Sequence, residues 1–222
     1  MRCLALGEEW TKRGGVIHTS GTPDKNSVVV FDGYQWENRA LKMWGEGRNL
    51  VVRIDDRDLS GLTEILLCDV FINPNYGAYE EHLPPLPKHC RALIGPEYFM
   101  LRDDILNAKV SSGGGFIDAD VRDIDVSKFA QILASADSVI CSASTKAHEA
   151  LFFGKPIILR QTADNQAIPY NAMILEDYAV PDGSGLEPSP NVGQKAIDGR
   201  GRERVVDAIF EEWVEWIDEY VK

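Results

Sequence analysis

Positive charge is scarce in this sequence. It has 23 Lys and Arg residues against 35 Asp and Glu residues, and its formal net charge at pH 7 is -12. Because nucleic acids and anionic membrane surfaces attract proteins through basic side chains, no nucleic acid and no membrane is expected as a partner. A local basic pocket for a phosphate group is still compatible with this balance.

Cysteine is also scarce, and long apolar runs are lacking. The four cysteines, Cys3, Cys68, Cys90 and Cys141, do not have the spacing of a metal site. Cys68 and Cys141 lie in apolar runs and are expected to pack as small hydrophobic side chains. With no signal peptide and no apolar run long enough to cross a bilayer, the sequence predicts a cytoplasmic protein in a reducing compartment.

Hydrophobic residues make up 44% of the chain, which is enough for one large domain or two small ones. The expected strands cover residues 16–19, 27–31, 50–54, 69–73, 91–94, 138–141 and 157–159. The expected helices cover residues 1–13, 35–47, 125–136, 167–175 and 203–221, with a further crossover helix before residue 154. Such alternation is typical of an α/β fold with parallel sheets.

The segment 138–159 carries the clearest functional pattern. Two apolar runs flank the small polar turn Ser142-Ala143-Ser144-Thr145 and the crossover helix. Small residues let a ligand approach the backbone, and the N–H groups at a helix start attract anions such as phosphate. Glu149, one turn into the helix, is placed to accept hydrogen bonds from the hydroxyl groups of a ribose. The alternative is an ordinary helix cap at Ser144 or Thr145, with Glu149 in solvent.

Acidic residues follow two of the expected strands. Asp32-Gly33-Tyr34 follows the strand 27–31, and Asp55-Asp56 follows the strand 50–54. In open α/β sheets ligands bind at the carboxyl ends of strands, so Asp32 and Tyr34 are candidate site residues. Paired carboxylates such as Asp55 and Asp56 suggest metal binding or acid–base chemistry, whereas a solvated turn is the simpler interpretation.

A triple glycine lies in the segment 111–115. Glycine-rich loops cradle phosphate when a strand precedes them and a helix follows, but neither is expected here. We therefore interpret this segment as an interdomain linker.

Several blocks, taken together and in order, resemble one family: the UDP-sugar hydrolases of nonulosonic (pseudaminic) acid synthesis, the PseG/SpsG group. The most specific block, residues 93–102, reads Leu-Ile-Gly-Pro-Glu-Tyr-Phe-Met-Leu-Arg and is similar to the family's Gly-Pro-x-Tyr…Leu-Arg signature. The other blocks are residues 1–6, 31–34, 54–56, 69–75, 142–149, 154–156, 164–166 and 171–172. The resemblance covers roughly residues 1–175, interrupted by deletions.

This family shares the two-domain GT-B fold with the MurG glycosyltransferases, so the resemblance implies two Rossmann-like halves with parallel sheets, reduced by deletions. The expected divisions are an N-terminal half at 1–108, a linker at 109–115, a nucleotide-sugar-binding half at 116–180, a surface loop at 181–202 and a C-terminal helix at 203–222.

The resemblance also implies a function. A UDP-sugar would bind in the cleft between the halves, and water would attack it and release UDP. The turn from Ser142 to Thr145 would meet the diphosphate, Glu149 the ribose, and Asn165 and Gln166 the sugar or phosphates. Tyr34 and Asp32 would stand near the reacting centre. Neither a metal nor a cofactor is implied.

The sequence also departs from this family. The family's essential histidine lies in a Gly-x-Gly-His loop before the segment that matches Met1, so no residue here corresponds to it. His148 is the candidate substitute, with a packing role as the alternative. Four hypotheses follow: a hydrolase, a glycosyltransferase in which an acceptor hydroxyl attacks instead of water, a degenerate binding or structural protein, and a longer protein whose Gly-x-Gly-His loop lies upstream of Met1. The family's first strand also has no counterpart, which would leave a sheet edge for a homo-oligomer to cover.

Overall fold

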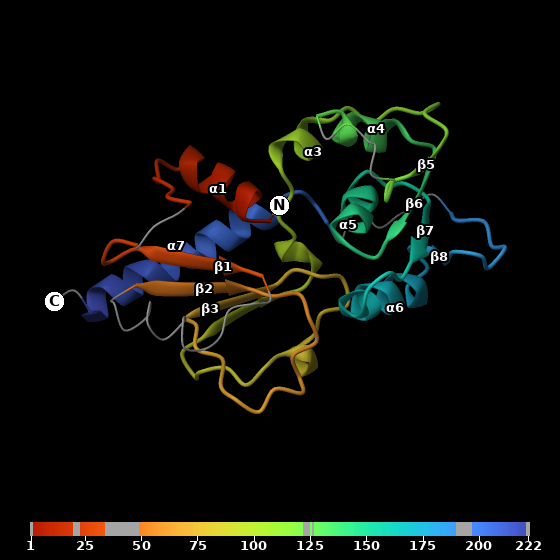
Figure 1. Ribbon diagram of the computed structural model, residues 1–222. Coiled ribbons are helices and arrows are strands. Elements are labelled where there is room, and N and C mark those ends of the chain that lie inside the picture. The colour runs from red at the N-terminus through yellow and green to blue at the C-terminus, as the bar shows by residue number, and fades with distance from the viewer. Residues whose placement is uncertain are drawn as a thin grey trace.

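Two parallel β-sheets form the frame of the protein in a computed structural model, which describes residues 2–19, 23–33, 49–121, 125, 127–189 and 197–220 (Figure 1). The first sheet has the strand order β1-β2-β3-β4, and the second has the order β5-β6-β7-β8. Every pairing within them is parallel. The predicted α/β class is confirmed, and the arrangement is consistent with two Rossmann-like halves.

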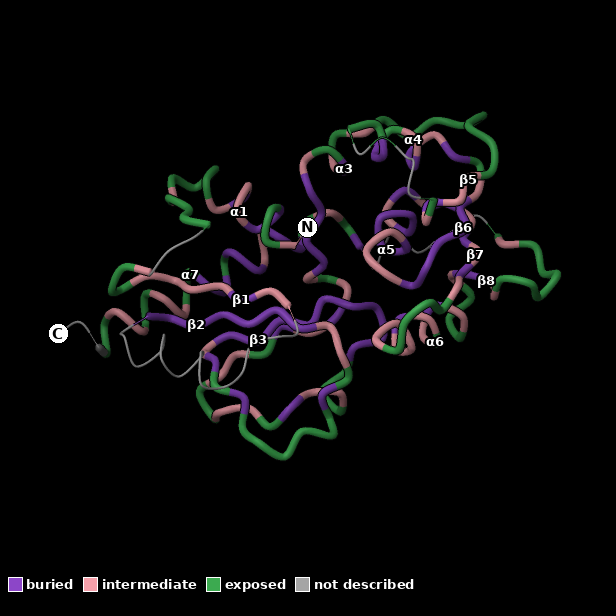
Figure 2. The backbone as a smooth tube through the Cα atoms, in the orientation of Figure 1, coloured by how far each residue is buried: buried purple, intermediate pink, exposed green. Residues whose placement is uncertain are grey.

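The first sheet is covered on both faces. Its strands are β1 (Val28–Asp32), β2 (Leu50–Ile54), β3 (Val70–Asn73) and β4 (Arg91–Ile94). Because side chains alternate along a strand, Val52 and Ile72 face the helices α1 (Arg2–Lys12) and α7 (Gly201–Tyr220). Val51 and Phe71 point the other way and pack under loop residues. Figure 2 shows β2 and β3 as buried strands, which explains their nearly continuous apolar sequences.

The second sheet belongs to a separate core. Its strands are β5 (Phe116–Asp118), β6 (Ser138–Ser142), β7 (Ile157–Arg160) and β8 (Val180–Pro181). The helices around it are α3 (Asp103–Asn107), α4 (Phe129–Ser135), α5 (Thr145–Phe152) and α6 (Ala167–Leu175). Short 3-10 turns lie at Glu80–His82 and Pro96–Tyr98, on either side of β4 in the chain, and at Asp164–Gln166 after β7. Leu133, Leu151 and Leu159 are fully buried in this core.

The last helix, α7, returns to the first half and packs beside α1 (Figure 1). The predicted helix 203–221 is confirmed over its described residues, in which Val205 and Ile209 are buried in the core of the first half and Trp213 and Trp216 pack against that core. The chain therefore starts and finishes its described course on the same half.

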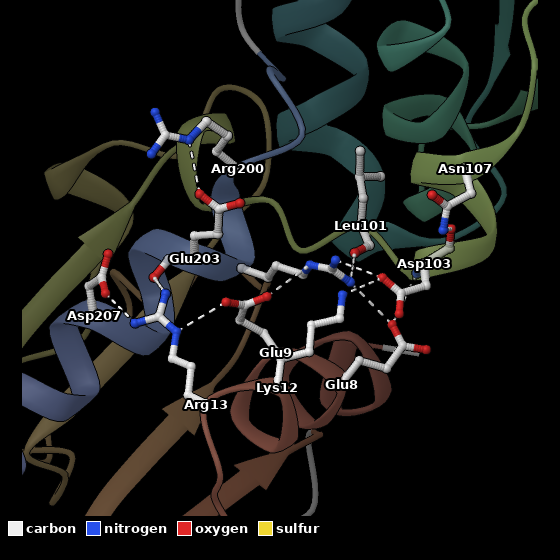
Figure 3. A network of polar contacts seen from close by, with 11 residues as sticks. Glu8, Glu9, Lys12, Arg13, Leu101, Asp103, Asn107, Arg200, Glu203 and Asp207 are labelled. Carbon is white, nitrogen blue, oxygen red and sulfur yellow. Dashed lines mark hydrogen bonds and ion pairs between the residues drawn. The ribbon is translucent and has the colours of Figure 1, made fainter.

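A network of ion pairs joins α7 to α1 and to the start of α3 (Figure 3). Its centre is Arg202, whose side chain is 7% exposed. Its guanidinium lies 2.7 Å from the carboxylate of Asp103 and 3.3 Å from that of Glu8. Lys12 also pairs with Asp103, at 2.7 Å. Since α3 packs on the second core through Ile105, this network links the two halves.

One predicted strand does not form in the structure. Residues 16–19 form no strand, and Val16 and Ile17 are exposed. A β-branched run favours a strand only where another strand pairs with it, and no described strand does so here. The predicted helix 35–47 lies outside the described residues.

The triple glycine, in the segment predicted as a linker, makes hydrogen bonds to residues of the second half. The N–H groups of Gly113 and Gly115 donate to the carboxylate of Asp137 at 2.8 and 3.0 Å, and the N–H of Gly114 donates to the carbonyl of Ser135. A Cβ at Gly114 would lie 2.5 Å from that carbonyl oxygen, so a close backbone approach requires glycine here. The hydrogen bonds from Gly113 and Gly115 hold the pKa of Asp137 below its usual value. The loop therefore cradles the chain's own carboxylate.

Candidate functional site

A cavity of about 280 Å³ lies where the carboxyl ends of both sheets meet. Asp32 ends β1, Asp56 follows β2 and Asn75 follows β3, and these three come from the first half. The second half contributes the turn after β6 and the segment after β7. The lining residues from both sides are Arg2, Asp32, Asp56, Asn75, Ala143, Ser144, Thr145, Asn165 and Gln166. The carboxyl edge of parallel strands is the usual ligand-binding edge of α/β folds.

The first wall of the cavity is built around Arg2, at the start of α1. One guanidinium nitrogen lies 2.6 Å from Oδ1 of Asp32, and another lies 3.0 Å from Oδ2 of Asp56. The packing of α1 against the first sheet carries this cation over the ends of β1 and β2. Two carboxylates thus share one guanidinium, which leaves the wall acidic and rich in hydrogen-bond acceptors.

The loops beneath this wall are fixed by buried polar contacts. Asn75 donates from Nδ2 to the carbonyl of Asp56 at 3.1 Å. Asp55 is fully buried and accepts hydrogen bonds from Arg53 at 2.8 Å and from Arg57 at 2.7 Å. Burial would raise the pKa of Asp55, but the bonds from Arg57 and Arg53 outweigh it and hold the pKa below the usual value. Asp55 therefore supports the fold of the loop, while Asp56 lines the cavity.

The second wall is the turn between β6 and α5. The backbone N–H of Ser142 donates to one carboxylate oxygen of Asp120 at 2.6 Å, and the Ser142 hydroxyl lies 3.1 Å from the other. Lys146 pairs with the same carboxylate at 3.2 Å. Asp120 thereby fixes the turn from behind, and Ser144 and Thr145 at the start of α5 face the cavity. A helix N-terminus carries partial positive charge, so this wall favours an anion.

Asn165 and Gln166 complete the second wall from the 3-10 turn after β7. The Gln166 side-chain oxygen accepts hydrogen bonds from the backbone N–H of Thr162 at 2.8 Å and from its hydroxyl at 3.1 Å. This bond orients the amide group of Gln166. The two residues bring polar amide groups into the cavity.

His148 lies behind the second wall and is fully buried. Its Nε2 accepts a hydrogen bond from the backbone N–H of Tyr76 at 2.9 Å, and its Nδ1 lies 2.9 Å from the carbonyl of Ser144. These partners require a neutral ring with its proton on Nδ1, because one nitrogen must accept and the other must donate. The ring stacks on Phe99 with centroids 4.4 Å apart. Burial lowers the pKa of His148 to about 4.

The surroundings of His148 therefore differ from those of a catalytic base. Both ring nitrogens are occupied by backbone groups, and His148 is not among the residues that line the cavity. The packing role, the alternative interpretation of this residue, is the one that its contacts support. It connects α5 of the second half with the loop after β3 of the first.

Glu149 also points away from the cavity lining. It is 2% exposed, and its Oε1 lies 3.5 Å from a guanidinium nitrogen of Arg102. Its Oε2 is buried and has no hydrogen-bond partner within the described part of the chain. Burial raises the pKa of Glu149 to about 7, although Arg102 acts against that rise. The ribose role of Glu149 stays a prediction that would need its side chain to turn from Arg102.

The structure brings six of the sequence-predicted residues to one cavity: Asp32, Ala143, Ser144, Thr145, Asn165 and Gln166. Ser142 lies directly behind them and is held by Asp120. Tyr34 lies outside the described residues. Sequence reasoning assigned no role to Arg2 or Asn75, although both fall within blocks of the family resemblance. A basic residue at the start of a helix gives no local sign of the carboxylates it will meet.

The fold and the site define an α/β protein with two parallel sheets and a polar cavity where their carboxyl ends meet. Comparison of the chain with protein-family models and with curated proteins gives no match. Within the described ranges, no group of three or more His, Cys, Asp or Glu residues is placed to hold a metal ion. No helix in the described part is long and apolar enough to span a membrane.

Proposed function

We propose that the chain binds a UDP-sugar in the cavity between its two halves and hydrolyses it to release UDP. The observation that carries this proposal is the pairing of two unlike walls across one cavity. One wall is acidic, with Asp32 and Asp56 around Arg2, and the other presents the start of α5 with Ser144 and Thr145. A nucleotide sugar has a polyhydroxyl part and a diphosphate part, which match these two chemistries.

The proposed binding mode follows from that match. The diphosphate lies at the N-terminus of α5, where partial positive charge and the small residues Ala143 and Ser144 let it approach the backbone. The sugar lies toward Asp32 and Asp56, whose carboxylates accept hydrogen bonds from its hydroxyl groups. Asn165 and Gln166 lie between these two parts. The same positive end of α5 would stabilise the charge on the departing UDP.

The course of the chain supports a GT-B type of arrangement, which we include in the proposal. Two all-parallel sheets contribute their carboxyl ends to one cavity, and α7 returns from the second half to pack on the first.

We further propose that the protein works in the cytoplasm, because its few cysteines fit a reducing compartment.

The attacking water needs a group that accepts its proton. Among the described lining residues no histidine is present, and His148 has both nitrogens occupied. We propose Asp32 for this role, because it ends β1 at the cavity and Arg2 fixes its orientation at 2.6 Å. The occupied state of His148 also favours a second candidate function, a protein that binds the nucleotide sugar without turning it over.

The test begins with binding of UDP by isothermal titration calorimetry. Wild type should bind, and Asn165→Ala should bind at least about tenfold more weakly, since an amide hydrogen bond to a charged ligand is lost. Asn107→Ala is the matched control, because Asn107 is exposed on α3 and lies outside the cavity lining. It should bind as wild type does. Absence of UDP binding by the folded wild type would overturn the proposal.

Turnover separates the remaining candidates. Release of UDP from a UDP-sugar in water alone would support a hydrolase. Release that requires an added sugar acceptor would indicate a glycosyltransferase, and binding without release under either condition would indicate the binding protein.

A further inference from the structure

Two cysteines lie in contact on the first half, away from the candidate site. The Sγ atoms of Cys68 and Cys90 are 3.7 Å apart. Cys68 lies two residues before β3 and Cys90 one residue before β4, and the pairing of Val70 with Arg91 brings the two chain segments close where these strands begin. Both are free thiols in this structure. Their neighbourhood is the amino end of the strands, whereas the cavity lies at the carboxyl end.

We propose that Cys68 and Cys90 form a redox modification site, in which oxidation by a small-molecule disulfide such as oxidised glutathione joins them in an intramolecular disulfide. The sulfurs need to close from 3.7 Å to about 2 Å, which rotation of the side chains and a small backbone shift can supply. The pairing of β3 with β4 already holds the two segments close, so a large chain movement is not needed for the bond to form.

The two thiols have different access to solvent, which sets the order of the reaction. Cys90 is partly exposed, and Cys68 is 4% exposed. The hydrogen bond with Cys90 and burial raise the pKa of Cys68 far above its usual value, so Cys68 stays a thiol until its partner has reacted. A surface cavity of about 90 Å³ reaches Cys68 past Leu67, Pro87 and His89.

The proposed exchange balances in two steps. The Cys90 thiolate attacks one sulfur of oxidised glutathione, which breaks that disulfide and releases one glutathione thiolate. The Cys68 thiol then loses its proton to the released thiolate, attacks Sγ of Cys90 and releases the second glutathione. Two protein thiols are oxidised to one disulfide, and one molecule of oxidised glutathione is reduced to two molecules of glutathione.

The disulfide would close the segment 68–90 into a loop. That segment carries β3 and Asn75, which lines the candidate site. Because cross-linking restricts the unfolded chain, oxidation is expected to raise the melting temperature by several degrees. Cys3 is exposed and Cys141 is buried alone, so neither offers a neighbouring thiol for this reaction.

The experiment treats the folded protein with oxidised glutathione and maps its peptides without reduction. Wild type, Cys3→Ser and Cys141→Ser should each show one cross-link between Cys68 and Cys90, with the loss of two hydrogen atoms from the intact mass. Cys68→Ser and Cys90→Ser should show none, and only they should lose the rise in melting temperature.

Two results would overturn the proposal. One is wild type that acquires glutathione on Cys90 and never converts it to the cross-link. The other is a cross-link that involves Cys3 or Cys141. Circular dichroism of each serine variant before oxidation shows whether it is folded, and the wild-type result stands even if one variant is not.

Discussion

The backbone N–H of Tyr76 donates a hydrogen bond to Nε2 of His148 across the boundary between the two halves, at 2.9 Å. The Tyr76 hydroxyl also donates to Glu176, at the end of α6. One loop residue of the first half is thus tied to two elements of the second. The relative position of the cavity walls depends on such contacts.

Replacement of His148 should destabilise the protein in a pH-dependent way. The neutral ring is favoured in the folded state, where its pKa is about 4 against the ordinary 6.5. The stability that it contributes is complete above about pH 6.5 and is lost as the pH falls toward 4, because protonation then favours the unfolded chain. Urea titrations between pH 4 and 8 should show that wild type is more stable than His148→Gln by about 1–3 kcal/mol at pH 8, and that this difference shrinks as the pH falls toward 4. An unchanged pH profile in the variant would contradict the prediction.

Glu149 should make the folding stability depend on pH with the opposite sign to that of His148. Its pKa is raised to about 7 from 4.5, so the folded state holds the proton more tightly than the unfolded chain does. Stability is therefore lost as the pH rises from about 4.5 to 7. Glu149→Gln should remove that loss, and the carboxyl group of Glu149 should titrate near pH 7 by nuclear magnetic resonance in the unliganded protein. Titration at its ordinary value would show that the carboxyl is not buried beside Arg102.

Gly77 should tolerate no side chain, because it lies against α6 across the boundary. Its φ is +75°, and a Cβ there would be 2.3 Å from Cβ of Ala172. Gly183 has the same φ of +75° with open space around it, which makes Gly183→Ala a matched control. Gly183→Ala should cost about 1–2 kcal/mol for the backbone conformation alone. Gly77→Ala should cost at least about 1 kcal/mol more for the clash, measured by urea denaturation.

A second substitution checks the source of that difference. In Gly77→Ala combined with Ala172→Gly, the colliding methyl group is removed, so the additional cost relative to Gly183→Ala should shrink. If the double variant is no more stable than Gly77→Ala, the contact with α6 is not the cause.

Replacement of Arg202 should lower the stability of the protein far more than replacement of the nearby Arg200. Removal of the buried guanidinium leaves Glu8, Glu9 and Asp103 close together without their shared cation. Arg202→Met is expected to lower the free energy of unfolding by about 3 kcal/mol. Arg200 is 68% exposed and pairs only with Glu203 among the contacts drawn in Figure 3, so Arg200→Met should change it by less than about 1 kcal/mol. Equal effects of the two variants would count against the network as a link between the halves.

Asp32 should affect turnover more than binding. If it accepts the proton of the attacking water, Asp32→Asn should slow UDP release by about 10²–10⁴-fold while UDP still binds. Asp24→Asn, an exposed aspartate in the turn before β1, is the control and should be without effect. Loss of UDP binding in Asp32→Asn would instead assign this carboxylate to the binding site.

The sequence by itself determined the strands β1, β2, β3, β4, β6 and β7, because their apolar runs and flanking turns are local signals. It also determined most of the cavity lining, since polar residues that follow parallel strands gather at one edge wherever the sheets form. Asp32 and Ser144 could be predicted for that reason, whereas Asn165 was predicted from the family resemblance. The strand β8, which pairs with β7, has only two residues and therefore gives no apolar run that could be recognised in the sequence.

Only the tertiary structure decided which polar groups meet. Arg2 reaches Asp32 and Asp56 because α1 packs across the ends of β1 and β2. His148 and Glu149 are adjacent in sequence, yet one binds the backbone of Tyr76 and the other faces Arg102, because successive residues of a helix point in different directions. Burial, hydrogen bonding and the resulting pKa values depend on partners that are distant in the sequence, so a local sequence pattern does not predict them.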